Sequence, residues 1–321
     1  RGWPGDPRAA ALGMRLNAAI HALARLGRPQ VLSDLYERKH SDFDAAVAAA
    51  LAMEDKFIAD WMRDPPQTNE VSRAASIMAA LAVAQEQFDM PLELLELGSS
   101  AGLNLNLAQY AYDLGGFVAG DPQSLVKIAP EWRGAPPPTS HVQVLAARGV
   151  DISPLDVNDD ATRERLLAFV FADQPDRAER LRQAIEVARR HPPRVDRADA
   201  AVWLEKRLSE PQAPGRCRAI FHSMVLQYLS AEAREAVEEA IAKASFRADM
   251  ERPLVRIGFE WTEKRDEVQL RLTCWPSGES RVLAVCHPYG AWVNWRAESL
   301  QRAGHEDAGW AQGELRMRKV S

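Results

Sequence analysis

A short segment near position 100 combines residue types and spacing that suit ligand binding. Positions 94–104 read LLELGSSAGLN, so an apolar run reaches Glu96 and a turn of small residues follows from Gly98. Small residues let a ligand approach the backbone closely, and a helix that begins after such a turn presents amide donors and partial positive charge to an anionic group. The Glu96 carboxylate would in turn accept hydrogen bonds from a ligand's donors. The segment therefore predicts a binding site at the end of a strand.

Two further acidic residues follow later predicted strands. Asp151 comes directly after the run 142–150, and Asp199 stands between two alanines after a short strand around Val195. A ribose suits such carboxylates because both of its hydroxyls donate. A single aspartate is as typical of a turn or a helix cap, so only the order of the three acids after successive strands favours a site. We expect Glu96, Asp151 and Asp199 to lie beside one hollow.

Four other polar residues are candidates for handling a substrate. His222 ends the fourth predicted strand, and an ordinary pKa of about 6.5 suits a general base, although a histidine at a strand end is more often structural. Asn69 and Arg73 lie at the start of a predicted helix just before the first strand. From there their side chains can reach over the turn of small residues that begins at Gly98. The paired donors of Arg73 suit a carboxylate, and the alternative for both residues is a solvated helix start. Asn69, Arg73 and Asn104 are the residues predicted to bind the substrate.

The same turn also fits a serine hydrolase. The pentapeptide GSSAG matches the pattern G-x-S-x-G with Ser100 as nucleophile, and Asp199 followed by His222 or His287 keeps the order Ser, Asp, His. Such an enzyme builds several strands before this turn, whereas here the turn follows the first predicted strand. Glu96 would also be a desolvated carboxylate without a partner. A nucleoside-binding site is therefore favoured, and a ligand-binding module without catalysis is the third hypothesis.

Helical periodicity dominates the first ninety residues. Apolar residues recur every three or four positions in several stretches, as in helices that bury one face. Pro65, Pro66 and Pro91 interrupt this pattern because proline removes a backbone donor. We expect a helical cap over residues 1–90.

Residues 91–321 alternate short apolar runs with amphipathic segments, which is typical of parallel-sheet proteins. The predicted strands are 92–97, 142–150, the surroundings of Val195, and 218–222. The predicted helices are 100–112, 161–171, 176–190 and 230–244. Three more strands are predicted at 254–262, 268–275 and 281–286. No helix fits between the last two, so we expect the sheet to finish antiparallel.

The composition limits the class of protein. The 321 residues include 40 Lys and Arg against 45 Asp and Glu, a net charge of −5 without basic clusters, which argues against a nucleic-acid partner. The apolar stretches fall short of the roughly 20 residues that cross a membrane, and the first residues lack an apolar signal core, so we expect a cytoplasmic protein without a membrane partner. Three isolated cysteines fit a reducing compartment, and without zinc-ligand spacing no metal is predicted.

Glu96, Gly98 and Gly102 form an acidic residue followed by glycines around a tight turn, with Ser100 in place of a middle glycine. This pattern resembles the opening motif of class I S-adenosylmethionine-dependent methyltransferases. The resemblance extends over about residues 91–295 and implies a Rossmann-like fold with a seven-stranded, mostly parallel sheet that ends antiparallel, behind the helical cap. It implies S-adenosylmethionine as cofactor and methyl transfer to a small-molecule substrate. The expected cofactor-binding residues are Glu96, Gly98, Ser99, Ser100, Gly102, Asp151 and Asp199.

Five groups of residues spread along the chain carry a second resemblance. They are TNEV at 68–71 with Arg73, GSSAGLNL at 98–105, GVD at 149–151 with PLD at 154–156, RAERLR at 177–182 and HPYG at 287–290. With these residues the chain is similar, over nearly its whole length, to an uncharacterised bacterial family catalogued as domain of unknown function 2332 (DUF2332). The resemblance supports the fold and implies no particular reaction.

Overall fold

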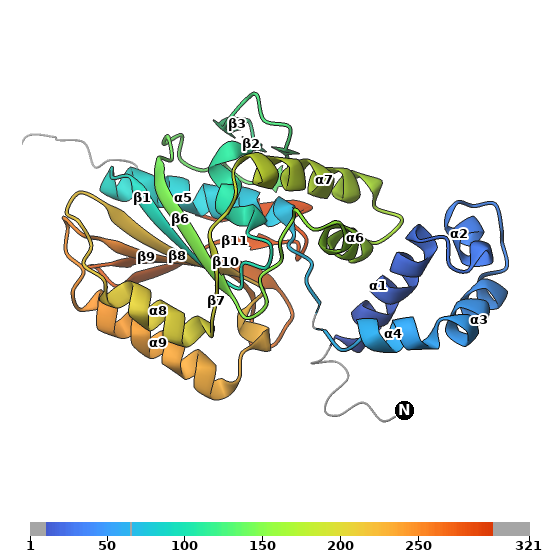
Figure 1. Cartoon of the computed structure of the whole chain (residues 1–321). Coiled ribbons are helices and arrows are strands. Elements are labelled where there is room, and N and C mark those ends of the chain that lie inside the picture. The colour runs from blue at the N-terminus through green and yellow to red at the C-terminus, as the bar shows by residue number, and fades with distance from the viewer. Residues whose placement is uncertain (1–10, 65, 298–321) are drawn as a thin grey trace, which may run out of the picture.

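The computed structural model describes residues 11–64 and 66–297 (Figure 1). A mixed α/β body is built on a nine-stranded sheet, and a group of helices lies at one side of it. The strands across the sheet are, in order, β5 (Glu131–Arg133), β12 (Trp292–Trp295), β11 (Glu279–Cys286), β10 (Val268–Trp275), β9 (Leu254–Trp261), β8 (Cys217–Ser223), β1 (Leu92–Leu97), β6 (Val144–Asp151) and β7 (Val195–Arg197).

Five neighbouring strands, β7, β6, β1, β8 and β9, run parallel. The central strand β1 is apolar on both faces, because Leu92 and Leu94 belong to one hydrophobic core and Leu95 and Leu97 to another. This double burial explains the continuous apolar run in the sequence. From β1 the chain goes first to β6 on one side and later to β8 on the other, so the strand order reverses between β1 and β8.

The other end of the sheet is a meander. Strand β10 pairs antiparallel with β9 and with β11, as the missing helix between the last two predicted strands indicated. The predicted number of seven strands is wrong, because β12 joins β11 and the short β5 joins β12 in parallel. Strands of three and four residues are too short to show a period of two, so the sequence pattern gave no sign of them.

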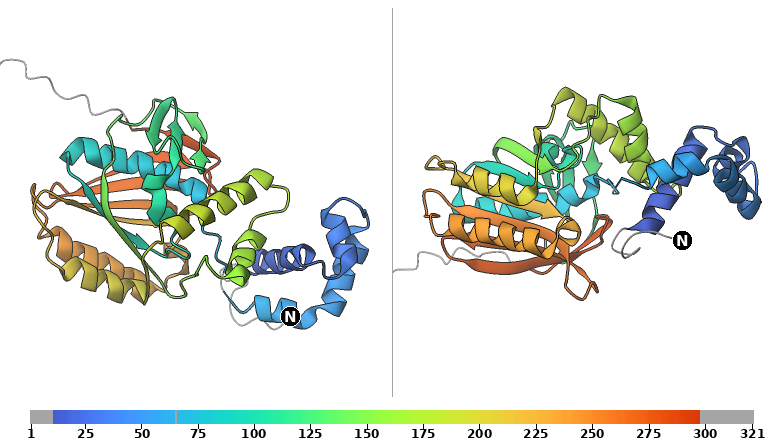
Figure 2. Two further views of the ribbon diagram at one scale, coloured as in Figure 1. Left: turned by 45° about the horizontal axis from the view of Figure 1, so that its top comes forward. Right: turned by 60° about the horizontal axis from the view of Figure 1, so that its bottom comes forward.

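Helices cover both faces of the sheet (Figure 2). On one face α5 (Ala74–Phe88) and α7 (Pro175–Arg190) complete the larger core with the Leu92 side of β1. On the other face α8 (Ala200–Ser209) and α9 (Ala231–Ser245) lie side by side and complete the smaller core. The Ser230 hydroxyl caps α9 by accepting the Ala233 amide at 3.1 Å, whereas α8 was not predicted.

The helices at the side have a core of their own. They are α1 (Leu12–Arg25), α2 (Gln30–Tyr36), α3 (Phe43–Met53) and α4 (Asp55–Trp61), and their shared core includes Leu23, Leu32 and Ile58. Helix α1 contacts α6 (Asp160–Ala168), where Arg25 forms an ion pair with Glu164 at 2.7 Å. Helix α5 packs into the core of the sheet although it falls within the predicted cap of residues 1–90.

The segment after the small-residue turn differs from the expected helix over residues 100–112. It forms the 3-10 helix η2 (Leu103–Gln109), which has non-helical dihedral angles at Asn106. A second sheet of β2 (Ala111–Leu114), β3 (Phe117–Gly120) and β4 (Lys127–Ile128) follows. Asparagine side chains compete with helical hydrogen bonds, and this segment has one at 104 and another at 106.

In the described part of the chain, every helix is too short or too polar to cross a lipid bilayer. The same residues contain no cluster of three or more histidine, cysteine, aspartate or glutamate side chains that is arranged to hold a metal ion.

Candidate functional site

A cavity of about 660 Å³ lies at the carboxyl-terminal ends of the parallel strands. It is found where the strand order reverses between β1 and β8, which is where open α/β sheets bind ligands, and its volume is typical of small-molecule sites. The ends of β1, β6 and β8 line it, together with residues 66–70, the start of α1 and the loop after β11. The predicted site residues in its lining are Glu96, Gly98, Ser100, Asp151, Asp199, Asn69, Arg73 and Asn104.

Glu96 is buried beside this cavity, and one of its oxygens has no partner. Only 2% of the residue is exposed, and Oε2 makes no hydrogen bond with the described residues. Burial raises the pKa of this carboxyl to about 8, Ser99 opposes the shift, and the charge of Asp151 adds to it. A buried polar atom without a hydrogen bond costs about 1–3 kcal/mol. Glu96 therefore suits a ligand that brings a hydrogen-bond donor.

The glycines of the turn are required by packing. Gly98 has φ +67°, and a Cβ there would lie 2.5 Å from Cγ2 of Val225. Gly102 has φ +72°, and a Cβ there would lie 2.8 Å from Cγ2 of Val195. Gly102 is absent from the described lining of the cavity, and so is the fully buried Ser99. Of the small residues predicted to hold a cofactor, Gly98 and Ser100 therefore reach the cavity.

The backbone amides of the turn are satisfied by the protein itself. The Ser100 amide donates to Oδ2 of Asp151 at 2.8 Å, and the Ala101 amide donates to Oδ1 of Asn69 at 3.1 Å. These contacts correct the expectation that the turn offers free amide donors to an anionic ligand. The Asp151 carboxylate takes the place of that anion, and its Oδ1 accepts the Ser153 amide at 2.8 Å.

Asp199 has both a structural role and a place in the cavity. It caps α8, since its Oδ1 accepts the amides of Ala201 at 2.9 Å and Val202 at 3.1 Å. Its neighbours Ala198 and Ala200 line the cavity beside it. The expected helix-cap role and the expected site therefore coincide in one residue.

Asn104 lies in the cavity wall with an unused acceptor. The residue is 3% exposed, and its Nδ2 donates to the Glu70 carbonyl oxygen at 3.4 Å. Its Oδ1 has no partner among the described residues. Asn104 and Glu96 thus both present buried acceptors to the cavity.

Ser100 has backbone geometry typical of a nucleophile turn but lacks the partners of a nucleophile. Its φ is +56°, a left-handed conformation that is rare outside glycine. Its hydroxyl donates to Oε1 of Gln67 at 2.5 Å. No histidine is among the described residues that line the cavity.

His222 is fully committed to hydrogen bonds. It is 1% exposed and is absent from the described cavity lining. Its Nε2 accepts a hydrogen bond from Nε of Arg256 at 3.1 Å, and because arginine only donates, the ring proton is on Nδ1. Nδ1 donates to Oε1 of Glu260 at 2.8 Å, and the same oxygen accepts the Val225 amide at 3.0 Å. Glu260 thereby ties His222 to the segment after β8 that lines the cavity.

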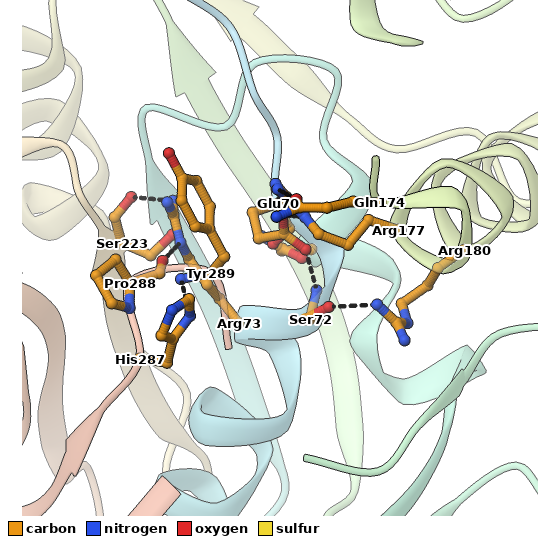
Figure 3. A network of polar contacts seen from close by, with 11 residues as sticks. Glu70, Ser72, Arg73, Gln174, Arg177, Arg180, Ser223, His287, Pro288 and Tyr289 are labelled. Carbon is orange, nitrogen blue, oxygen red and sulfur yellow. Dashed lines mark hydrogen bonds and ion pairs between the residues drawn. The ribbon is translucent and has the colours of Figure 1, made fainter. Parts of the chain in front are cut away.

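A second network next to the cavity was missed at the sequence level (Figure 3). Glu70, 6% exposed, forms an ion pair with Arg177 of α7, and the Arg177 guanidinium lies over the Tyr289 ring at 4.3 Å. Arg73 donates from Nε to the Pro288 carbonyl oxygen at 2.8 Å. Arg73 was a predicted substrate residue, whereas Glu70, Arg177 and Tyr289 entered only through the second resemblance, and nothing local indicated that these residues meet.

The fold and the cavity define a mixed α/β protein with a ligand-sized site at the carboxyl edge of its parallel strands. A comparison with protein families matches residues 1–295 to the family described as "Uncharacterized protein conserved in bacteria (DUF2332)". The chain belongs to this family, which confirms the resemblance seen in the sequence. A search of the curated proteins found no match.

The groups of residues that carry the resemblance meet around the cavity. Residues 68–70 and Arg73 line it, and so do parts of the turn at 98–104 and the end of β6. The loop 287–290 contributes Pro288 and Tyr289 to the lining, and Arg177 packs against that Tyr289 ring. Four of the five groups that carry the resemblance thus contribute residues to the lining of one cavity, although they are far apart in the sequence.

Proposed function

We propose that this protein binds S-adenosylmethionine in the cavity and transfers its methyl group to a small molecule. The observation that carries the proposal is the buried, unpartnered Oε2 of Glu96 at the end of β1, beside Asp151 and Asp199. The Rossmann-like methyltransferase fold is part of the same proposal, and the order of the parallel strands supports it.

The charge of the cavity favours this cofactor over nucleotides that carry phosphates. Glu96, Asp151 and Asp199 line one cavity, and the turn amides that would bind a phosphate already donate to Asp151 and Asn69. The part of the ligand that lies against these acids is therefore expected to be rich in donors or positively charged. S-adenosylmethionine has ribose hydroxyls, amino groups and a cationic sulfur, and when bound it supplies an activated methyl group. Glu96, Gly98, Asp151 and Asp199 would hold it.

Catalysis in such a site depends chiefly on positioning. Arg73, Asn69 and Asn104 line the cavity and are proposed to orient the substrate. His222 was predicted as a general base, but Glu260 and Arg256 hold both ring nitrogens. We assign His222 to positioning Val225 and its neighbours through Glu260.

The serine hydrolase alternative receives less support. The left-handed Ser100 favours it, but the Ser100 hydroxyl donates to Gln67 instead of a base. The amide of Ala101, which would stabilise an oxyanion, already donates to Asn69. We expect a fluorophosphonate probe to leave the protein unlabelled. Labelling that disappears in the Ser100→Ala variant would establish the hydrolase instead.

Calorimetry with S-adenosylmethionine and with its demethylated product tests the proposal. We expect saturable binding that weakens about tenfold or more in Glu96→Gln, because a cationic, donor-rich ligand favours the ionised carboxylate of Glu96, and Gln cannot ionise. Glu93→Gln is the matched control, since Glu93 lies on the same strand and pairs with Arg216 at 2.9 Å, away from the cavity. No heat with either ligand at high concentration would overturn the proposal, and binding without methyl transfer to any acceptor would favour a non-catalytic module.

A further inference from the structure

We propose that the cavity binds an α-amino acid group, with the ammonium at Glu96 and Asn104 and the carboxylate at Arg73. This inference rests on the ligand-binding role proposed above and names the chemistry of the part of the ligand that lies under Arg73.

Arg73 is a buried cation without an acidic partner. The residue is 7% exposed, yet no carboxylate among the described residues lies within ion-pair distance of it. Its guanidinium donates to two backbone carbonyl oxygens, those of Pro288 at 2.8 Å and Ser223 at 3.4 Å. These bonds use Nε and Nη1, and no hydrogen bond joins Nη2 to the described residues.

The neighbouring Arg177 shows what is missing at Arg73. Arg177 is also largely buried, and it forms its ion pair with Glu70, three residues before Arg73. A buried charge without a counter-charge is costly, so a ligand anion at Arg73 would supply the compensation that Glu70 gives Arg177. Because Nη2 is unused and Arg73 lines the cavity, a carboxylate is the anion that its planar geometry favours.

At the other end of the site, two buried side-chain oxygens have no hydrogen bond with the described residues. Oε2 of Glu96 and Oδ1 of Asn104 are both buried in the cavity wall, and neither has a partner among residues 11–64 and 66–297. An ammonium group has three donors, so it can donate to both oxygens, and its positive charge favours the ionised form of Glu96. A hydroxyl has one donor and would leave one of the two unsatisfied.

The backbone positions that hold the two ends of the site are close together. Glu96 lies opposite Phe221 in the pairing of β1 with β8, and the Ser223 carbonyl that holds Arg73 is two residues further along β8. With about 4.8 Å between strands and about 3.3 Å per residue, the Cα atoms of Glu96 and Ser223 are roughly 8 Å apart. Side chains anchored at positions this close together can reach the ammonium and the carboxylate of one amino acid group, which are attached to the same carbon.

The side-chain directions agree with this placement. Side chains alternate along a strand, so Glu96 points to the same face as Leu92 and Leu94. That face is covered by α5, and Arg73 is the last residue of the short helix η1 (Val71–Arg73) directly before α5. The carboxylate and the guanidinium therefore approach the cavity from the same side of the sheet.

Two sources of such a group are compatible with the site. One is the amino acid end of the cofactor, and the other is a free amino acid that accepts the methyl group. Calorimetry with three kinds of probe separates the two sources. The first is S-adenosylhomocysteine, the demethylated product of the cofactor, and the second is 5′-methylthioadenosine, a thionucleoside that lacks the amino acid end. The third is the set of twenty common amino acids, tested one by one with and without S-adenosylhomocysteine.

The variants Arg73→Gln and Arg73→Lys test the anion end. If the cofactor is the source, Arg73→Gln weakens S-adenosylhomocysteine roughly tenfold to a hundredfold and leaves 5′-methylthioadenosine within about twofold. The unchanged thionucleoside shows that the variant is folded. Arg73→Lys keeps the charge and is expected to lose less. If an amino acid is the substrate, Arg73→Gln abolishes its heat and leaves both nucleosides unchanged.

The remaining outcomes separate this inference from the proposed function. Equal binding of both nucleosides, insensitive to Arg73, with no amino acid bound, overturns the inference and leaves the cofactor site intact. Arg73-dependent binding of an amino acid without any nucleoside binding supports the inference and overturns the proposed function. Silence with every probe overturns both.

Discussion

Asp151 accepts the backbone amide of Ser100 on Oδ2 at 2.8 Å, across a gap of 51 residues in the sequence. Asp151 was expected to contact the ligand independently of the turn. Its carboxylate is instead hydrogen-bonded to the turn itself. A protein carboxylate at this place leaves no amide of Ser100 for an anionic ligand, which is one reason why we propose a donor-rich ligand for the cavity. The same contact makes Asp151 a residue whose replacement affects stability as well as binding.

Replacing Asp151 by Asn should destabilise the protein. Each oxygen of Asp151 accepts a backbone amide, from Ser100 and from Ser153, and the amide nitrogen of Asn would face one of these donors. We expect the free energy of unfolding to fall by about 2 kcal/mol in urea titrations, the usual size for hydrogen bonds to charged groups. Asp156→Asn is the control, because Asp156 is exposed and only its Oδ1 accepts hydrogen bonds from the described residues, from the backbone amide and Nδ2 of Asn158. Equal stability of both variants would contradict the proposed role.

Glu96→Gln should stabilise the ligand-free protein at alkaline pH. Burial raises the pKa of Glu96 to about 8 in the folded state, against 4.5 as its ordinary value. Between these values the folded protein holds a proton that the unfolded chain has lost, so stability decreases as the pH rises from about 4.5 to about 8. The loss amounts to as much as about 5 kcal/mol, and Gln, which resembles the protonated form, avoids it.

The measurement is the free energy of unfolding at several pH values. The variant and the wild type should agree near pH 5 and diverge above pH 6, with the variant more stable at pH 9. Glu93→Gln should show no such gain, because Glu93 pairs with Arg216 near the surface. Parallel curves for Glu96→Gln and the wild type would show that Glu96 is ionised throughout. A stabilised variant that binds its ligand less well is the pattern expected of a functional group.

The sequence predicted those parts of the site that local patterns determine. Glu96 was identified because an apolar run and a turn of small residues are neighbours in the chain, and Asp199 because it follows a short strand. The contacts that these site residues make could not be predicted from the sequence. Asn69 contacts the turn 32 residues away in the chain, and Glu260 contacts His222 from the neighbouring strand, β9 beside β8. Register and loop contacts depend on the packed fold, which one-dimensional periodicity does not contain.

Glu260→Ala should loosen the segment that follows β8. Oε1 of Glu260 accepts His222 Nδ1 at 2.8 Å and the amides of Val225 at 3.0 Å and Leu226 at 3.4 Å. Without it, we expect hydrogen exchange at Val225 and Leu226 to accelerate about tenfold or more. Ligand affinity should decrease as well, because Met224 and Val225 line the cavity.

Two variants make this test specific. Glu260→Gln keeps an acceptor oxygen and is expected to restore part of the protection. Glu238→Ala removes the carboxylate at the far side of Arg256, which it meets at 2.6 Å, and should leave the exchange at Val225 unchanged. If Glu260→Ala leaves exchange at Val225 and Leu226 as in the wild type, the positioning role of His222 and Glu260 is refuted.

The ion pair of Glu70 and Arg177 should show strong coupling in a double-mutant cycle. Both side chains are largely buried, and Arg177 also lies over the Tyr289 ring at 4.3 Å. Arg177→Met alone leaves the buried Glu70 carboxylate unpaired and should lower the free energy of unfolding by about 3–5 kcal/mol. The double variant with Glu70→Gln removes both charges. Its loss of stability should therefore be smaller than the sum of the losses in the two single variants. The pair Glu186 and Arg189 on the same helix is the control, since both side chains are about half exposed at 3.0 Å and their coupling should stay below about 0.5 kcal/mol. Similar coupling in the two pairs would mean that the loop 287–290 and α7 are held at the cavity by packing alone.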